Sequence, residues 1–514
     1  MFRRVASLLL TLGLGTSAPN VSERLARPDI FPSIPEIRSV RGVASLSLDV
    51  VLDPVDGKPT FEYGGIAGVV PTIRVSPGDT IALTVHDVLP AAQGQPSDVN
   101  VHFHGLIVSP QAPGDEVLRT LAHSGGSVRY VIKIPADHEP GLYWYHPHVH
   151  GTTYAQVTNG MSGAIVVEGL QQHLPVLQTM RERIIVLRDV PIGPNAIDED
   201  MPMTGMAGMN GPSPARGASA APRKATNAAN PCRAESALQP TLNRQLHAHI
   251  GIRPGERQFF RVVNASASRY FDLSVDGSTL GLVARDGVPL DAYPGAPPLE
   301  FVRHVLLPPA SRAEFIVTGP AHPSELRSAC FNSGPTGDAD PAVDLATLVD
   351  PAPNDAEDLP SLDPRVGRAL PPNLLSQPLP PPAVSRTIRF TEDADGFYLN
   401  GKAFAMGDRP SIVARSGTVE AWTLVNETDE VHDFHIHQVH FVTASLNGLP
   451  VKPRIWSDTV NVPPRRRLAD GRYAAGNATI IVDFRDPVVR GTFVYHCHIL
   501  DHEDQGMMAV IRVI

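Results

Sequence analysis

Cysteine is scarce in this chain of 514 residues, which contains only Cys232, Cys330 and Cys497. Three thiols exclude a scaffold built on disulfides, because at most one bridge can form while one thiol stays single. Cys232 and Cys330 could pair, and the sequence leaves that pairing open. Cys497 stands between two histidines and needs a separate explanation.

The chain also lacks a basic excess and a long apolar run. It has 43 basic and 53 acidic residues, a formal net charge of −10, and no long basic stretch. We therefore expect no nucleic-acid partner. No segment reaches the roughly 20 apolar residues of a membrane-spanning helix, so we expect no stable membrane insertion. The protein is expected to be a monomer.

The first twenty residues have the pattern of an export signal. Arg3 and Arg4 precede an apolar run over residues 5–14, and small residues follow at 15–18. The paired arginines leave both the general and the twin-arginine export routes open. We expect a signal peptide over residues 1–20 and a periplasmic or secreted location.

Convincing helical periodicity is rare, and turn residues are abundant. The 42 glycines and 51 prolines exceed the usual share and favour many turns and short strands. Runs such as 80–85 and 128–134 look like short strands, and the second alternates with the period of a half-buried strand. Three similar turns each lead into an apolar strand, so three copies of one β-sandwich fit the length. These turns lie at 76–79, 253–256 and 415–418.

Two segments interrupt this pattern and divide the chain. Residues 198–240 are rich in Ala, Gly, Pro and Met and indicate an irregular insertion. Residues 353–385 are rich in proline and indicate a semi-rigid linker. We therefore expect domains over residues 21–175, 176–352 and 386–514, with the insertion inside the second domain.

The most informative feature is the clustering of histidine. In a strand, residues i and i+2 share a face, so His-x-His projects two imidazoles together from a rigid backbone. Imidazole is a good ligand for Cu, Zn, Fe and Ni. One such pair is weak evidence, but four in one chain predict a metal site. Half of the 20 histidines lie in four clusters: His102-Phe103-His104, His146-Pro147-His148, His432-Asp433-Phe434-His435-Ile436-His437, and His496-Cys497-His498 with His502.

The last cluster predicts a particular metal. A thiolate, imidazoles and a weak thioether form the ligand set of a blue-copper site. Cys497 is followed by His502 and then by Met507, and His432 can supply the second imidazole. Met508 is adjacent, so the axial ligand could shift by one residue, although the spacing favours Met507. A closed zinc site is the rival, but structural zinc rarely needs so many histidines.

The same strand suggests a path for electrons. His496 and His498 share one face, and Cys497 points to the other. An electron that arrives at the sulfur therefore has a route through bonds to the imidazoles behind it. Reduction of dioxygen to water takes four electrons, which an entry copper plus a three-copper cluster can store together.

Together these motifs resemble the three-domain multicopper oxidases, the family of laccases, cuprous oxidases, bilirubin oxidases and ascorbate oxidase. The resemblance is strong over residues 40–170 and 386–514, and over 180–350 it rests only on the layout of strands and turns. It implies an all-β fold of three cupredoxin-like Greek-key sandwiches. It also implies a type 1 copper in the third sandwich and a trinuclear cluster between the first and the third.

The resemblance implies a complete set of ligands for four copper ions. The type 1 copper would take His432, Cys497, His502 and the axial Met507. The type 2 copper would take His102 and His435. The type 3 pair would take His104, His146 and His498 on one ion and His148, His437 and His496 on the other.

Some positions depart from the family pattern or remain open. Asp433 stands where the family has proline, and it could face solvent, tune the type 1 potential or contact substrate. Gln438 stands where a glycine usually follows the third histidine. Proton delivery to oxygen needs a carboxyl near the cluster, and the candidates are Asp115 and Asp501. For both residues, ordinary structural hydrogen bonding is the alternative.

The resemblance implies a copper-dependent oxidoreductase with oxygen as acceptor. It would oxidise phenol-like or other small reductants by single electrons and reduce dioxygen to water. A cuprous-ion oxidase in copper tolerance is one alternative, since thioethers select Cu(I) and the insertion carries four methionines, although a merely flexible apolar loop is the simpler explanation of them. A non-catalytic cupredoxin-fold protein is the other alternative. The four methionines are Met201, Met203, Met206 and Met209.

Overall fold

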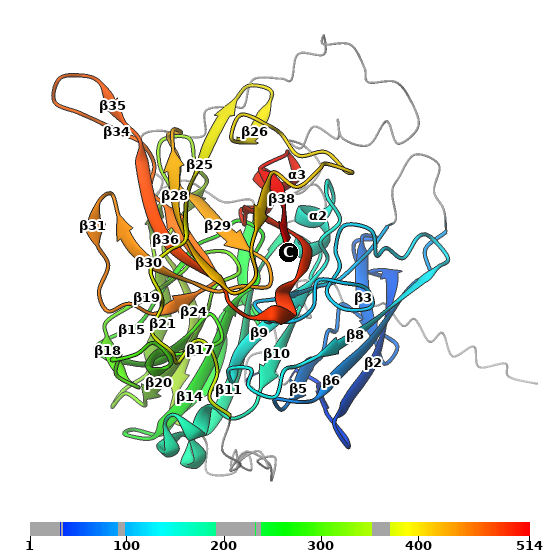
Figure 1. Cartoon of the computed structure of the whole chain (residues 1–514). Coiled ribbons are helices and arrows are strands. Elements are labelled where there is room, and N and C mark those ends of the chain that lie inside the picture. Colours follow the sequence, from blue (N-terminus) through cyan, green and yellow to red (C-terminus); the bar gives the residue numbers. More distant parts are fainter. Residues whose placement is uncertain (1–30, 32–33, 91–97, 192–231, 233–237, 352–370) are drawn as a thin grey trace, which may run out of the picture.

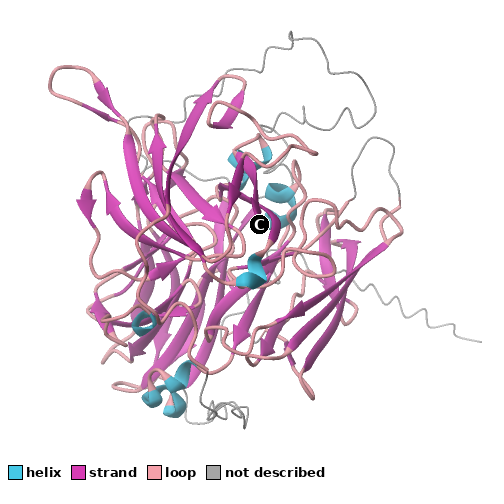
Figure 2. Ribbon diagram, viewed as in Figure 1, coloured by secondary structure: helices cyan, strands magenta, loops and turns pink. Residues whose placement is uncertain are grey.

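The computed structural model describes residues 31, 34–90, 98–191, 232, 238–351 and 371–514. Its regular elements are mostly strands, and the few helices are short (Figure 2). Strands form three pairs of sheets, and each pair encloses one apolar core. The predicted all-β class with three cupredoxin-like sandwiches is confirmed.

The first sandwich, blue to cyan in Figure 1, packs a sheet of order β1-β5-β10-β9-β7 against one of order β4-β3-β2-β6-β8. Strands β6 and β8 cover the predicted strands at 80–85 and 128–134, and the alternating burial of β8 agrees with the alternation predicted for the second of them. Its strands are β1 (Glu36–Arg38), β2 (Val43–Leu52), β3 (Pro59–Tyr63), β4 (Ile66–Ala67), β5 (Thr72–Val75), β6 (Thr80–Asp87), β7 (His102–His104), β8 (Ser127–Lys133), β9 (Gly141–His146) and β10 (Gly163–Val167).

The second sandwich packs a sheet of order β12-β11-β14-β20-β16-β17 against one of order β13-β24-β21-β15-β19, and β18 pairs with β16. A small hairpin, β22-β23, lies outside these sheets. The strands are β11 (Arg181–Pro191), β12 (Leu238–Leu242), β13 (Ala248–Gly251), β14 (Arg257–Asn264), β15 (Phe271–Val275), β16 (Leu280–Arg285), β17 (Val288–Pro289), β18 (Glu300–Val302), β19 (Val305–Leu307), β20 (Arg312–Thr318), β21 (Ser324–Ala329), β22 (Phe331–Asn332), β23 (Ala339–Asp340) and β24 (Val343–Val349).

The third sandwich packs a sheet of order β26-β25-β28-β36-β30-β31 against one of order β27-β38-β37-β29-β33. Strand β32 pairs with β30, and β34-β35 form a separate hairpin. The strands are β25 (Val384–Asp393), β26 (Gly396–Leu399), β27 (Ile412–Ala414), β28 (Thr418–Asn426), β29 (His432–Ile436), β30 (Phe441–Leu446), β31 (Leu449–Pro450), β32 (Trp456–Ser457), β33 (Thr459–Val462), β34 (Arg466–Arg467), β35 (Tyr473–Ala474), β36 (Gly476–Phe484), β37 (Gly491–Cys497) and β38 (Met508–Val513).

Two short helices join the first and third sandwiches. Asp504, at the end of α3, accepts hydrogen bonds from the backbone N–H groups of Gly151, Thr153 and Tyr154 around the start of α2. None of the helices in the described part of the chain is long and apolar enough to cross a membrane. The helices are α2 (Thr153–Thr158), α3 (Leu500–Asp504), η1 (Leu170–Gln172), η2 (Pro175–Thr179), η3 (Leu290–Ala292) and η5 (Pro487–Val489).

The predicted boundaries differ in detail from the observed strands. Residues 238–240, expected in the insertion, already belong to β12, and residues 384–385, expected in the linker, belong to β25. The rest of the insertion apart from Cys232, with its four methionines, lies outside the described residues, as does the expected signal peptide. The domain boundaries therefore stay predictions.

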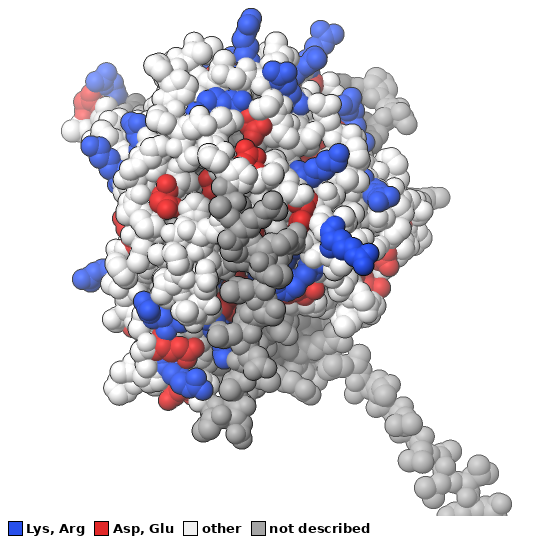
Figure 3. All heavy atoms as spheres, turned by 60° about the horizontal axis from the view of Figure 1, so that its bottom comes forward, with Lys and Arg blue, Asp and Glu red and all other residues white. Residues whose placement is uncertain are grey.

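Cysteine pairing, which the sequence left open, is resolved by the structure. Cys232 and Cys330 form a disulfide, with their Cα atoms 5.5 Å apart. Cys497 is a free, buried thiol at the end of β37. On the face shown in Figure 3, basic and acidic side chains of the described residues are interspersed rather than gathered by sign.

Candidate metal centres

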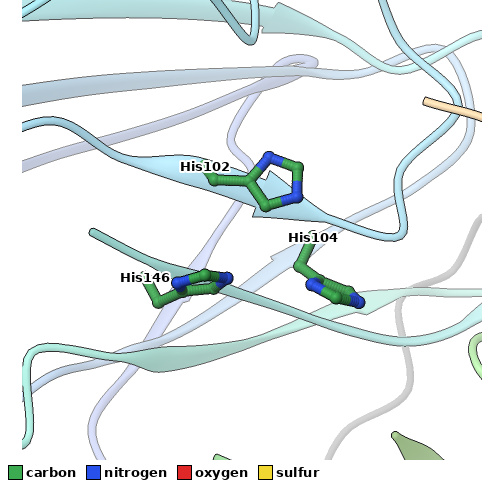
Figure 4. Close-up of side chains that lie close together, drawn as sticks. All are labelled: His102, His104 and His146. Carbon is green, nitrogen blue, oxygen red and sulfur yellow. The ribbon is translucent and has the colours of Figure 1, made fainter. Parts of the chain in front are cut away.

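Strands β7 and β9 present the first-sandwich histidines. They pair antiparallel, with His102 opposite His146. Because side chains alternate along β7, His102 and His104 share a face while Phe103 packs into the core against Tyr130. Figure 4 shows the rings of His102, His104 and His146 lying close together, and those of His102 and His146 have centroids 5.5 Å apart.

Strands β29 and β37 present the histidines of the third sandwich in the same way. They pair antiparallel, with His435 opposite His496 and Phe434 opposite Cys497. Cys497 lies in the core of this sandwich, which also contains Phe434. The thiol and the adjacent imidazoles therefore occupy opposite faces of β37, as the alternation predicts.

The two sets of histidines meet between the first and third sandwiches. The Nε2 atoms of His148, His437 and His496 lie 3.2 Å from one another. The rings of His104 and His435 stack with centroids 3.9 Å apart, and His104 lies 5.0 Å from His498. We call this group the histidine cluster, and it consists of His102, His104, His146, His148, His435, His437, His496 and His498, all buried.

The histidine cluster has the chemistry of a metal site. The Nε2 atoms of His102, His146 and His435 are buried and have no hydrogen-bond partner among the described residues. Burial lowers the pKa of His146 and His435 well below the ordinary range, so these imidazoles are neutral. A neutral imidazole nitrogen is the form that binds a metal ion. The residues present therefore fit bound metal.

Asp115 orients one of these imidazoles. Its Oδ2 accepts a hydrogen bond from His102 Nδ1 at 2.9 Å, and its Oδ1 accepts one from the Phe103 N–H at 3.1 Å. A carboxylate on Nδ1 leaves the Nε2 lone pair free for a metal. Gln438 Nε2 also donates to Asp115 Oδ2, at 2.7 Å. The structure thus places Asp115 beside the histidine cluster, where the sequence analysis expected a carboxyl.

Asp501 does not lie beside the histidine cluster, where we expected it. Glu503 lies there instead. Asp501 Oδ1 is 3.9 Å from Nε2 of His502, which belongs to the other group of ligands. Glu503 is fully buried, and its Oε1 lies 3.6 Å from His148 Nδ1 while its Oε2 lies 3.4 Å from His496 Nδ1. Both residues are in α3, where positions two apart point in nearly opposite directions. Sequence analysis missed Glu503 because it did not predict this helical turn.

The surroundings of Glu503 favour the protonated form of its carboxyl group. Burial raises the pKa of Glu503 well above its ordinary value, and the nearby Asp504 carboxyl adds to the effect. Thr153 Oγ1 donates a hydrogen bond to Oε1 at 3.3 Å. Burial likewise raises the pKa of Asp504 to about 7. A protonated carboxyl therefore stands against two imidazoles of the histidine cluster.

The second group of ligands surrounds Cys497. Its Sγ lies 3.7 Å from Nδ1 of His432 and 3.7 Å from Nδ1 of His502, and these nitrogens are 3.2 Å apart. Met507 is fully buried in the same core as Cys497, whereas Met508 packs in a separate cluster with Val494. The structure thus favours Met507 over Met508 as the fourth ligand. We call His432, Cys497, His502 and Met507 the cysteine cluster.

Neighbouring side chains hold the two imidazoles of the cysteine cluster. Thr428 Oγ1 lies 3.0 Å from His432 Nε2, and Glu430 Oε1 lies 3.6 Å from His502 Nε2. Phe397 stacks on His502 with ring centroids 4.0 Å apart. These contacts direct both Nδ1 atoms towards the sulfur. Burial raises the pKa of the Cys497 thiol well above its usual range, and only a bound cation would favour the thiolate there.

Asp433 does not face solvent, which was one of the predicted alternatives. It is fully buried, and in the described part of the chain neither carboxyl oxygen has a hydrogen-bond partner. The reason is that β29 is an inner strand, flanked by β33 and β37. Burial raises the pKa of Asp433 well above its ordinary value, so the side chain is a neutral acid.

Arg312 and Asp458 also support the histidine cluster, and sequence analysis missed both. The Asp458 backbone oxygen accepts from His435 Nδ1 at 2.8 Å, and its Oδ1 lies 3.5 Å from His104 Nε2. Arg312, from β20 of the second sandwich, donates two hydrogen bonds to the carboxylate, at 2.8 and 2.7 Å. No spacing in the sequence links these residues to the histidines, because three sandwiches bring them together.

Comparison with known proteins agrees with this geometry. Residues 62–172 and 377–514 match two family models that are both described as multicopper oxidase. The multicopper oxidase mco of Staphylococcus haemolyticus is 22% identical over 459 residues, which cover 86% of this chain and 81% of that protein. The laccase of Bacillus subtilis is 23% identical over 501 residues, which cover 85% of this chain and 87% of that protein.

A solved structure shows the same fold. A multicopper oxidase from Campylobacter jejuni, described as a metallo-oxidase, matches with a TM-score of 0.69 and 22% identity, over 96% of both chains. Three β-sandwiches that enclose one cysteine cluster and one histidine cluster define a class of copper-binding redox proteins. The two family models, the curated relatives and the solved structure together support a multicopper oxidase, that is, a copper-dependent oxidoreductase with oxygen as acceptor.

Proposed function

We propose that the protein couples the one-electron oxidation of a small, phenol-like reductant to the four-electron reduction of dioxygen to water. The observation that carries this proposal is that Cys497, the last residue of β37, lies in one cluster while its chain neighbours His496 and His498 lie in the other. The backbone of β37 is therefore a covalent link between a cluster for the reductant and a cluster for oxygen.

Four copper ions would supply the one-electron redox chemistry when bound. The cysteine cluster offers the type 1 set of His432, Cys497, His502 and Met507. One ion of the type 3 pair would be held by His148, His437 and His496. The equal spacing of their three Nε2 atoms supports this assignment. His104, His146 and His498 would hold the other type 3 ion, and His102 with His435 the type 2 ion.

One buried carboxyl group would supply protons for oxygen reduction, and a second would orient a ligand. Glu503 stands within 3.6 Å of His148 Nδ1 and holds its proton because it is buried. It is therefore the group best placed to give up a proton at the histidine cluster. Asp115 instead accepts the His102 N–H and keeps that ring in one tautomer. Asp501, close to His502, would act on the reductant side.

The reductant would approach the edge of His502. Glu430 Oε1 lies 3.6 Å from His502 Nε2, and both residues are buried, so an acidic oxygen adjoins the ligand through which an electron would pass. Such an oxygen can accept a proton from a phenol as the phenol is oxidised. It would also attract a cuprous ion, which keeps copper oxidation as the alternative reaction.

We also propose that the protein is a monomer and works in the periplasm or outside the cell. The disulfide between Cys232 and Cys330 supports an oxidising location. The pattern of residues 1–20 supports export.

The function is tested by stoichiometry. Copper-loaded protein is given a phenolic reductant or Cu(I) under air, while oxygen uptake and peroxide are measured together. The proposal predicts four phenol electrons for each oxygen consumed, and no released peroxide. Turnover of Cu(I) alone would establish the cuprous alternative instead. Protein that binds copper but consumes no oxygen with either donor would support the non-catalytic alternative.

A further inference from the structure

A glutamine occupies a backbone conformation that glycine adopts more readily. Gln438 follows His437 directly and has φ of 64°, in the left-handed region that residues other than Gly, Asn and Asp rarely enter. Its side chain is only 2% exposed. The family pattern has glycine here, which would avoid this strain. Strain that persists beside a functional site is a reason to look for a role of the side chain.

The Gln438 amide reaches the support of the histidine cluster. Its Nε2 donates to Asp115 Oδ2 at 2.7 Å, and the same oxygen accepts from His102 Nδ1 at 2.9 Å. With the Phe103 N–H on Oδ1, the Asp115 carboxylate has three donors that fix its plane. A continuous chain of hydrogen bonds therefore runs from Gln438 through Asp115 to His102, a proposed type 2 ligand.

Gln438 is also one of the residues that line a cavity. This cavity has an empty volume of about 470 Å³, its open mouth included, and it is lined in part by Ile107, His138, Gln438 and His440. Asp115 is buried and is not one of the described residues that line it. Gln438 Oε1 is buried without a hydrogen-bond partner among the described residues, so the amide that holds Asp115 is shielded from water.

We propose that Gln438 is a positioning residue with two effects. Its N–H group holds Asp115 against His102, and its side chain closes the inner end of the cavity, so that water and small anions do not reach the His102 side freely. This proposal rests on the proposed function, because it assumes a type 2 copper at His102 and His435. Gln438 would thus set both the geometry of the type 2 site and the access to it.

Two variants separate these effects. Gln438→Gly removes the N–H donor and opens the cavity, while it suits a φ of 64°. Gln438→Glu keeps the size of the side chain but loses the N–H donor and places a carboxyl against Asp115. Arg41→Gly is the matched control, because Arg41 also has positive φ, at 52°, but is exposed in the turn between β1 and β2. Copper-loaded samples of each are compared with the parent protein.

The readouts are the thermal midpoint, the electron paramagnetic resonance signal of type 2 copper, the affinity for that copper, and the rate of azide binding. For Gln438→Gly we expect a thermal midpoint no lower than that of the parent, an altered type 2 signal, and faster azide binding. For Gln438→Glu we expect an altered type 2 signal with azide binding unchanged. Loss of a group that supports a metal ligand typically weakens metal affinity about 10–100-fold, and we expect that range for both variants.

Several results would overturn the proposal. A parent-like type 2 signal in both variants would show that Gln438 does not position Asp115. A parent-like azide rate in Gln438→Gly would show that it does not close the cavity. A marked fall in the midpoint of Gln438→Gly but not of Arg41→Gly would reduce its role to packing. A parent protein that takes up copper but shows no type 2 signal would instead overturn the proposed function.

Discussion

The two clusters of ligands are assembled in different ways. The cysteine cluster belongs entirely to the third sandwich, with three of its ligands between residues 497 and 507 and His432 on the neighbouring strand. The histidine cluster takes half of its ligands from the first sandwich and half from the third. The cysteine cluster is thus a property of one sandwich. The histidine cluster exists only when two sandwiches are held together.

The second sandwich contributes none of the ligands but holds the histidine cluster together. Arg312 donates to the Leu142 carbonyl of the first sandwich, to the Asp286 carbonyl of its own, and to the Asp458 carboxylate of the third. Gly105, next to His104, has φ of 85°, and a Cβ atom there would collide with the Arg312 guanidinium. One fully buried side chain therefore ties the three sandwiches together beside the histidine cluster.

The largest effect is expected from Cys497→Ser. It removes the sulfur ligand, through which an electron would pass from the type 1 copper into the backbone of β37, so we expect turnover to fall by at least roughly 10³-fold, since residues that act as a unit fail together. The visible absorption of the type 1 site should disappear. The histidine cluster should still bind its copper, because none of its ligands changes. Loss of copper from both clusters, measured by metal analysis, would contradict this independence.

Arg312→Gln should affect the other cluster: the histidine cluster should lose its copper and the cysteine cluster should keep its own. It leaves Asp458 buried without its charged partner, which typically costs about 3–5 kcal/mol. We expect type 2 and type 3 copper to be lost while the type 1 absorption survives. The matched control is Arg465→Gln, whose bidentate pair with Asp429 lies at the surface, where such pairs contribute about 0–1 kcal/mol. Equal losses in the two variants, measured by chemical unfolding and metal content, would refute the role of Arg312.

Glu182→Gln tests the contact between the first and second sandwiches. Burial alone would raise the pKa of Glu182, but Arg74 and Arg261 outweigh it and lower the pKa from 4.5 to about 2. A depressed pKa stabilises the fold above pH 4.5, and this contribution disappears as the pH falls towards 2. We expect the variant to lose about 3 kcal/mol at neutral pH and to show a flatter acid limb than the parent. Parallel stability curves from pH 7 to about 2 would exclude this charge contact as the cause.

Asp433→Asn should have the smallest effect. Because burial keeps the Asp433 carboxyl neutral, an amide of the same size changes little. We expect the unfolding free energy to change by less than about 1 kcal/mol, and the type 1 spectrum and reduction potential to stay close to those of the parent. A large rise in the type 1 potential would instead show that this carboxyl is ionised beside His432.

Spacing in the sequence predicted the features that depend on one strand well. It predicted poorly the features that depend on contacts between strands or between sandwiches. The opposite faces of Cys497 and His496 follow from strand alternation, and the burial of Met507 beside Cys497 agrees with its spacing. The choice between Asp501 and Glu503 depended on one helical turn that the sequence analysis did not predict. The burial of Asp433 depended on which strands flank β29. The roles of Arg312 and Asp458 depended on contacts between sandwiches that are distant in the chain.

Anomalous diffraction at the copper edge, from crystals of the copper-loaded protein, tests the central claim most directly. The account predicts one copper peak bounded by His432, Cys497 and His502, and three more inside the histidine cluster, with ligands from both the first and the third sandwich. A histidine cluster without copper, or copper held there by residues of only one sandwich, would contradict the account.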